Sequence, residues 1–122
     1  MKSIEETIIQ FIDLLDKTGS KLPEFKGATN YKVYFCSGGP GAIPMLTMAA
    51  QMFPNLSDKL MHHACKIGHI IWEKGLIIKG NGLCHGIVGN GYMLHTLFRT
   101  FDLLAKNSDN RKEKRYFTLL AI

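Results

Sequence analysis

Two cysteines and one histidine are the side chains of this 122-residue sequence best suited to chemistry. Cys84 and His85 are adjacent within a glycine-rich stretch, and Cys36 lies 48 residues upstream. Two thiolates and a neutral imidazole suit zinc, and three protein ligands leave one position of a tetrahedral ion open for water or a substrate, as in catalytic sites. The alternative is that both cysteines are small buried hydrophobic residues and that His85 caps a helix.

The segments around the two cysteines are copies of each other. Residues 36–46 (CSGGPGAIPML) align without a gap with residues 84–94 (CHGIVGNGYML), and five positions are identical. A repeat of this kind favours one shared site over two unrelated buried thiols. We therefore predict that Cys36, Cys84 and His85 are metal ligands.

The backbone around these residues must meet two conditions. Adjacent side chains of a regular helix diverge by about 100°, so Cys84 and His85 can share an ion only where the backbone is irregular, which Gly82 and Gly86 allow. If each cysteine precedes the N-terminus of a helix, packing those helices side by side brings the two motifs together. The free N–H groups at that end are expected to lower the pKa of both thiols.

The elements that position these residues are predicted to be helices. Apolar residues recur at helical spacing, and no run alternates with period two, so the chain is predicted to be all-α. The expected helices are Ser3-capped Ile4 to about Lys17, Gly41 to Phe53, a helix capped by Ser57 or Asp58 and stopped by Gly75, Val88 to Lys106, and the start of a fifth in the last dozen residues. An amphipathic helix, a loop, a glycine-rich motif and an apolar helix occur twice in this order. We expect two helix-pair repeats and the beginning of a third.

Composition indicates one globular domain without a membrane span. Hydrophobic residues make up 46% of the chain and charged residues 20%, and charged side chains interrupt every long apolar stretch. Much of the net charge of +5 comes from residues 111–115 (RKEKR), which we interpret as a solvated segment rather than a nucleic-acid site. Three cysteines cannot form a closed disulfide framework, and the N-terminus does not resemble a signal peptide, so a cytoplasmic location is expected.

The glycine-rich motifs resemble those of a known family. Residues 80–92 (GNGLCHGIVGNGY) resemble the GxGLCHGxxGNxY signature of the lanthionine synthetase C-like (LanC-like) proteins, and residues 36–41 (CSGGPG) resemble the WCxGxPG motif of the adjacent repeat. The similarity covers nearly the whole chain and is closer to the eukaryotic type. It implies an α/α toroid of inner and outer helices, with Cys36, Cys84 and His85 binding zinc at the end of the inner barrel.

The resemblance also implies a reaction. In the family, zinc activates a thiol for addition to a dehydroamino acid, and the thiol is a peptide cysteine in bacterial cyclases and glutathione in eukaryotic members. Lys79 matches a lysine of the eukaryotic pattern that is associated with glutathione binding or proton transfer. Its cation could hold a glutathione carboxylate or stabilise charge during addition, and the alternative is an exposed loop lysine.

The sequence departs from the family pattern at three positions and in length. Phe35 replaces the usual Trp and is expected still to pack, Ser37 replaces a His or Tyr, and Lys32 stands where bacterial cyclases carry an arginine. Residues 1–122 are therefore expected to be a partial LanC-like helical-repeat domain, whose open edges favour self-association. Enzymatic activity is expected of the full-length parent rather than of this stretch alone. The alternative is a non-catalytic glutathione-binding or protein-interaction module with structural or vestigial zinc.

The remaining polar and aromatic residues have simpler interpretations. The third helix is expected to carry a solvated face of His62, Lys66 and His69. Cys65 is predicted to be a buried, inert thiol beside Trp72. The fourth helix carries a stripe of Tyr92, His95 and Arg99. This stripe either lines a toroid lumen or reflects ordinary packing and surface charge.

Overall fold

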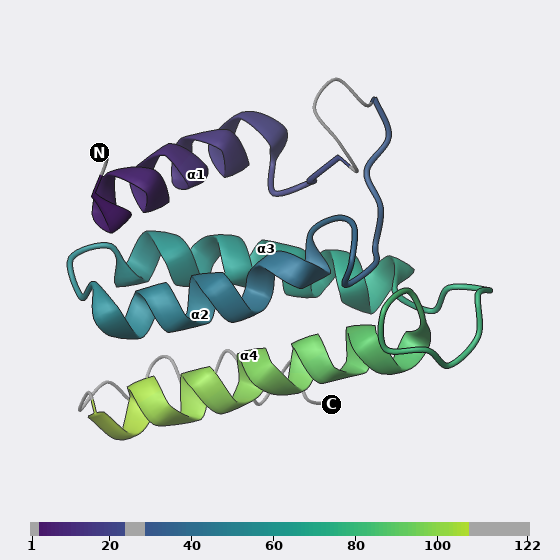
Figure 1. Cartoon of the computed structure of the whole chain (residues 1–122). Helices are drawn as coiled ribbons and strands as arrows, with labels where there is room; N and C mark the ends of the chain where they lie inside the picture. Colours follow the sequence, from purple (N-terminus) through teal and green to yellow (C-terminus); the bar gives the residue numbers. More distant parts are fainter. Residues whose placement is uncertain (1–2, 24–28, 108–122) are drawn as a thin grey trace.

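Over the residues that the structure describes, the chain folds into four α-helices, in agreement with the all-α prediction. The computed structural model describes residues 3–23 and 29–107, in which no strand forms and two isolated β-bridges occur in the loops. The elements are α1 (Ile4–Thr18), the 3-10 turn η1 (Pro40–Ala42), α2 (Ile43–Met52), α3 (Ser57–Lys74) and α4 (Ile87–Asn107), as drawn in Figure 1. The predicted fifth helix lies outside the described residues.

The first helix begins and ends as predicted, to within one residue. The N–H of Glu6 donates to Ser3 Oγ at 3.2 Å, and the N–H of Ser3 donates to Glu6 Oε2 at 2.9 Å, which completes a capping box. At the other end Gly19 takes the left-handed conformation (φ 60°), and its N–H returns to the last turn of the helix.

The predicted cap of the third helix is wrong. Neither Ser57 nor Asp58 caps α3, because Leu56 occupies the flanking position and no side chain caps the helix there. The segment from Phe53 to Ser57 is already a tight turn, with the N–H of Leu56 donating to Phe53 O at 3.0 Å. Leu56 is therefore close to helical, whereas a capping residue normally has extended backbone.

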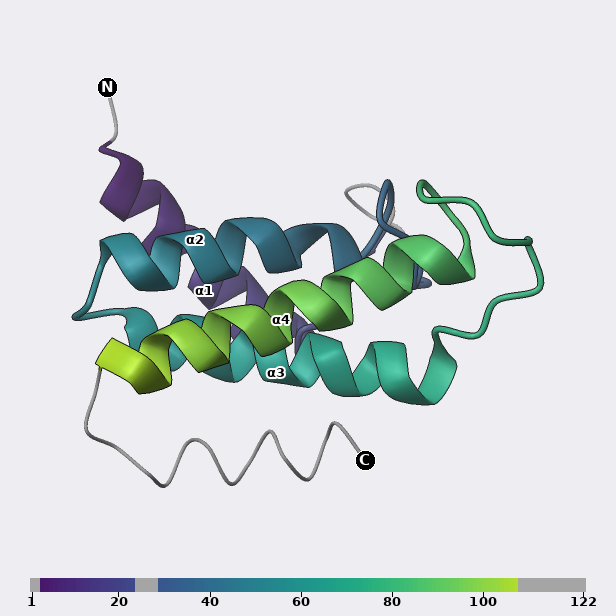
Figure 2. The same cartoon turned by 90° about the horizontal axis from the view of Figure 1, so that it is seen from below.

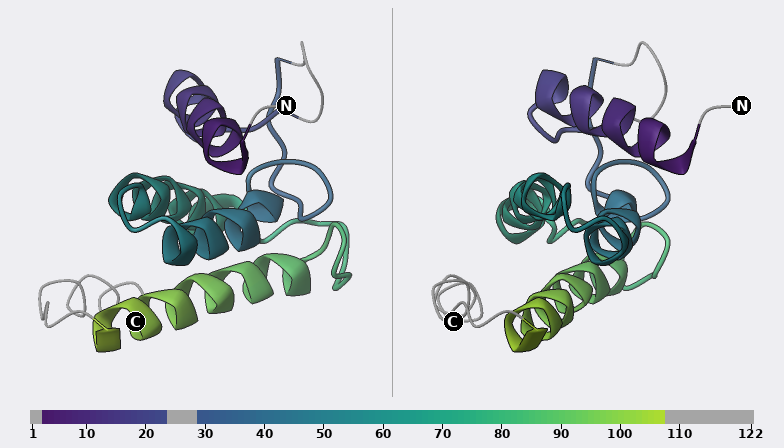
Figure 3. Two further views of the ribbon diagram at one scale, coloured as in Figure 1. Left: turned by 60° about the vertical axis from the view of Figure 1, so that its left-hand side comes forward. Right: turned by 90° about the vertical axis from the view of Figure 1, so that its left-hand side faces the viewer.

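The helices are arranged in three layers. Figure 3 shows α1 above a central layer of α2 and α3, with α4 below them. Helix α2 contacts both α3 and α4, and α1 contacts α3. The centre of the core consists of residues with almost no exposed surface, among them Leu15, Ile43, Leu46, Leu60, Ala64 and Ile67.

The side chains of α3 follow the predicted faces with one exception. His62, Lys66 and His69 are exposed, whereas the apolar residues at helical spacing on the core side are buried, namely Leu60, Ala64, Ile67 and Ile71. Cys65 is half-buried against the core instead of fully buried, and Trp72 is 61% exposed. None of the helices within the described part of the chain is long and apolar enough to cross a bilayer.

An apolar groove between α1 and α2 lies open to solvent. Its volume is about 420 Å³, and its lining includes Ile4, Met48 and Met52, each more than 60% exposed. The expected apolar edge is therefore present. Self-association through it stays a prediction.

A buried histidine joins the end of α1 to α3. His63 is 2% exposed, its Nδ1 lies 2.8 Å from the Oγ of fully buried Ser20, and its Nε2 lies 3.2 Å from Asp16 Oδ1. A neutral ring fits this pair, with Nε2–H donating to the carboxylate and Nδ1 accepting from the serine. Burial lowers the pKa of His63 from its ordinary value of 6.5, reinforced by His62 and Lys66 and opposed by Asp16.

Folding should therefore weaken in acid. The unfolded chain takes up a proton at His63 near pH 6.5 and the folded chain only at lower pH, so we expect the free energy of unfolding to fall as pH drops below about 6.5. The decline should stop below the lowered pKa of the folded state. Urea denaturation between pH 7.5 and 5 measures this, and His63→Gln should flatten the slope, whereas the exposed neighbour changed in His62→Gln should retain it. Equal slopes in the wild type and His63→Gln would contradict the assignment.

Candidate metal centre

Both cysteine motifs lie at the same end of the bundle. Cys36 is in the loop before η1 and α2, and Cys84 and His85 are in the loop before α4. Figures 1 and 2 show these loops side by side, where the N-termini of α2 and α4 meet. This is the placement expected from packing two repeat helices next to each other.

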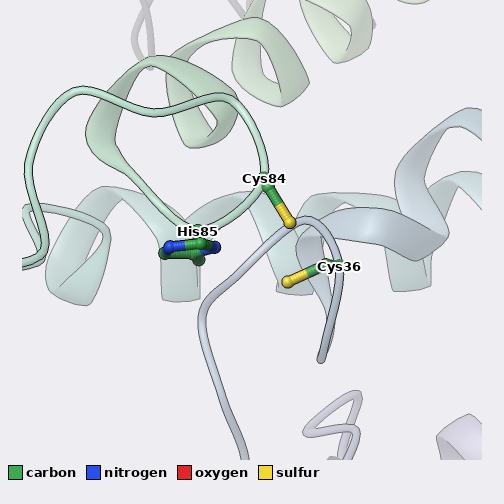
Figure 4. A group of neighbouring side chains, drawn as sticks. All are labelled: Cys36, Cys84 and His85. Atoms are coloured by element: carbon green, nitrogen blue, oxygen red, sulfur yellow. The ribbon is translucent and has the colours of Figure 1, made fainter.

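Three potential ligand atoms converge there. The sulfur atoms of Cys36 and Cys84 and a ring nitrogen of His85 all lie within 4.8 Å of one another. In Figure 4 the Cys84 sulfur points toward the Cys36 loop, with the His85 ring beside them. A backbone hydrogen bond also joins the two loops. The N–H of Cys36 donates to Cys84 O at 3.0 Å.

The donor set and spacing fit zinc. An ion about 2.3 Å from sulfur and about 2.0 Å from nitrogen, with tetrahedral angles, holds its ligands about 3.5–3.8 Å apart. The upper limit of 4.8 Å on the observed separations is about 1 Å longer than these values. All three residues are exposed, so a fourth position would be accessible to water or a small thiol.

In both copies of the motif, a glycine packs closely against a backbone carbonyl. A Cβ on Gly41 would lie 2.1 Å from Phe35 O, and a Cβ on Gly89 would lie 1.9 Å from Leu83 O. In each copy the glycine stands five residues after the cysteine, and the carbonyl belongs to the residue just before the cysteine. Only glycine lets the start of the helix approach this carbonyl so closely. The sequence repeat is therefore also a structural repeat.

Asn90 ties α4 to the segment before Cys36 and to the end of α3 by hydrogen bonds. Its side chain is buried, and Nδ2 donates to Val33 O at 2.9 Å and to Gly75 O at 3.0 Å. One carbonyl lies on the segment leading to Cys36 and the other at the end of α3. Asn90 belongs to the signature-like stretch, but sequence reasoning assigned it no role.

The two thiols influence each other. The pKa of Cys84 lies above its ordinary value, chiefly because its side chain hydrogen-bonds to Cys36, with desolvation and charge repulsion from Cys36 adding to the effect. This direction is opposite to the lowering expected from the helix N-terminus. Since zinc needs the thiolate form, metal uptake at this pair would release protons and strengthen as pH rises.

An aromatic residue that the sequence interpretation passed over lies beside the cluster. The rings of Tyr34 and His85 are 6.4 Å apart between centroids and meet edge to face at 62°. Lys79 Nζ lies 5.6 Å from the centroid of the Tyr34 ring, and Lys32 Nζ lies 5.9 Å from it. Lys79 is exposed, and its ammonium group lies near the ring that packs against His85. Only its position two residues before Cys36 could have singled out Tyr34.

The other positions singled out in the sequence lie differently. Phe35 is 44% exposed, so the packing expected of it is limited. Ser37 Oγ is buried and forms no hydrogen bond with any described residue. On α4, Tyr92, His95 and Arg99 are all exposed on the isolated chain.

Comparison with known proteins identifies the family. Residues 2–120 match the family described as "Lanthionine synthetase C-like protein". The chain is 37% identical over 82 residues to "Glutathione S-transferase LANCL1" of Danio rerio, covering 67% of this chain and 20% of that protein. It is 34% identical over 67 residues to "LanC-like protein GCL1" of Arabidopsis thaliana, covering 55% of this chain and 15% of that protein. No solved structure gives a significant match.

The matches cover only a small part of each relative. The aligned part of the chain spans a fifth or less of the length of either relative. Within residues 3–23 and 29–107 the chain forms helices and no strand, in agreement with part of the α/α toroid that the resemblance implies. Because the family match covers nearly its whole length, the chain belongs to the lanthionine synthetase C-like family.

Proposed function

We propose that this chain is the zinc-binding portion of a LanC-like protein that activates a thiol, glutathione or a peptide cysteine, for addition to dehydroamino acids. The observation that carries the proposal is the convergence of Cys36, Cys84 and His85 within 4.8 Å, from two loops 48 residues apart. The name of the Danio rerio relative, "Glutathione S-transferase LANCL1", supports glutathione as the thiol.

The chemistry follows from the donor set. An ion with these three ligands would supply an open position at which a thiol stays deprotonated near neutral pH. In the addition, the sulfur lone pair forms a C–S bond to the β-carbon of the dehydroamino acid, the C=C π bond breaks, and a proton is delivered to the α-carbon. Exposed Lys79 is suited to hold a substrate carboxylate or to stabilise the negative charge that develops before this protonation.

A second candidate function is a non-catalytic module. Ser37 stands where a His or Tyr is usual in the family pattern, and its hydroxyl is buried. A buried serine hydroxyl is a poor proton donor to a substrate at the exposed cluster. In that case the protein binds glutathione or another protein, and zinc is structural or vestigial.

Metal analysis tests the metal centre first. We expect the purified 122-residue chain to retain about one zinc per chain and Cys84→Ala to lose it, because two ligands do not hold zinc tightly. The matched control is Cys65→Ala, which removes the half-buried cysteine outside the cluster and should keep zinc. Sub-stoichiometric zinc in both the wild type and Cys84→Ala would refute the proposal.

Reaction with a dehydroalanine peptide separates the two functions. The zinc-loaded full-length protein, incubated with glutathione and the peptide, should give a thioether adduct detected by mass spectrometry. Zinc with four protein ligands and no adduct would instead favour the module.

Lys79 should affect thiol binding without affecting the metal. Removing its charge in Lys79→Gln should weaken glutathione binding to the zinc-loaded chain about fivefold, the effect of one partly solvated charge contact. Zinc content should not change. Titration calorimetry measures the glutathione affinity and metal analysis the zinc content, with Lys59→Gln, at an exposed lysine of α3, as control. Equal glutathione affinity in the two variants would show that Lys79 is an ordinary loop lysine.

A further inference from the structure

Tyr34 brings side chains of the two metal-site loops into contact. It lies in the loop that carries Cys36, yet its ring contacts His85 and Lys79 of the other loop. Lys32, from its own loop, approaches the same ring. The ring is half-buried, which limits its movement relative to the exposed side chains of Lys79 and His85.

His85 needs such a neighbour to act as a ligand. It is exposed and lies in an irregular loop, so the backbone alone leaves its ring free to rotate. A ring nitrogen reaches a shared ion only in one range of ring orientations, and contacts around a ligand normally select that range. Edge-to-face packing at 62° and 6.4 Å from Tyr34 is a preferred aromatic geometry and restricts the plane of the imidazole.

The two lysines depend on the same ring. Ammonium groups within about 6 Å of an aromatic centroid are attracted to its face. The distances of 5.6 Å for Lys79 and 5.9 Å for Lys32 lie within this range. Tyr34 therefore keeps two cations beside the cluster as well as one imidazole.

We propose that Tyr34 is a positioning residue that orients His85 toward Cys36 and Cys84 and holds Lys32 and Lys79 at the rim of the site. The inference rests on the proposed metal function, but it concerns the aromatic ring and not the ligands themselves. The ring acts through its π system, so the phenol hydroxyl is dispensable.

Zinc affinity tests the proposal. Tyr34→Leu removes the ring and should weaken zinc binding about tenfold, as expected for a residue that orients a ligand, whereas Tyr34→Phe should bind like the wild type. The matched control is Tyr31→Leu. Tyr31 is also half-buried and carries two lysine contacts, from Lys21 and Lys74, but it contacts no candidate ligand. Competition with a chelating dye measures the dissociation constants, and thermal unfolding shows that each variant is folded.

The ring orientation can also be followed without metal. In the metal-free chain, the His85 ring-proton resonances should shift in Tyr34→Leu and not in Tyr34→Phe or Tyr31→Leu, because only the first loses the neighbouring ring current. Unchanged His85 resonances in Tyr34→Leu would overturn the inference even if no chain bound zinc. If the wild type bound zinc and Tyr34→Leu bound it equally well, the role of Tyr34 would be overturned, while the proposed metal centre would stand.

Discussion

Gly89→Ala should disrupt the metal-site loop although it adds a single methyl group. The new Cβ would lie 1.9 Å from Leu83 O, which is backbone and cannot turn aside as a side chain does. Either the start of α4 or the loop that carries Cys84 must move. We expect a loss of about 3 kcal/mol in the free energy of unfolding and at least about tenfold weaker zinc binding.

The neighbouring glycine of α4 provides the control. A Cβ on Gly91 meets nothing within 4 Å, and alanine has the higher helix propensity. Gly91→Ala should therefore stabilise the chain by up to about 1 kcal/mol and keep zinc. Urea denaturation and zinc titration of the two variants give both quantities. Equal stability of Gly89→Ala and the wild type would contradict the close approach of the loop to the helix.

Much of the fold was predictable because its signals are local. The capping box of Ser3 and Glu6, the glycine at position 19 and the apolar spacing set the bounds of α1 to within one residue. The entry to α3 was not predictable in this way. The turn before Ser57 has already made the backbone at Leu56 nearly helical, so the polar residues nearby have no extended cap position to occupy.

The candidate site was predictable to the extent that it is repeated. The gapless alignment of residues 36–46 with 84–94 was enough to expect Cys36 and Cys84 at one end of paired helices. The opposing pKa direction at Cys84 was not foreseen, since it depends on the distance between the two thiols rather than on the helix end. Tyr34 was missed for a similar reason. Its contacts join segments that only the tertiary fold brings together.

Asn90→Ala should be among the most destabilising single changes in the described part of the chain. It removes two buried hydrogen bonds and leaves Val33 O and Gly75 O without this donor. Each lost bond costs about 1 kcal/mol, rising to about 3 kcal/mol where the buried acceptor stays unpaired, so we expect a total loss of about 2–6 kcal/mol from the two sites. The segment leading to Cys36 should loosen as well, which would lower zinc affinity.

A carboxylate of nearly the same size separates hydrogen bonding from packing at this position. Asn90→Asp keeps the volume but faces both carbonyl oxygens with an acceptor, so it should destabilise the fold more than Asn90→Ala does. Asn55→Ala is the control, because its side chain donates to Glu5 Oε1 on the exposed surface at 3.1 Å and should cost at most about 0.5 kcal/mol. Urea denaturation of the three variants gives the order. If Asn90→Asp were as stable as the wild type, the two carbonyls would not depend on the amide, and another contact would have to hold the Cys36 segment against α4.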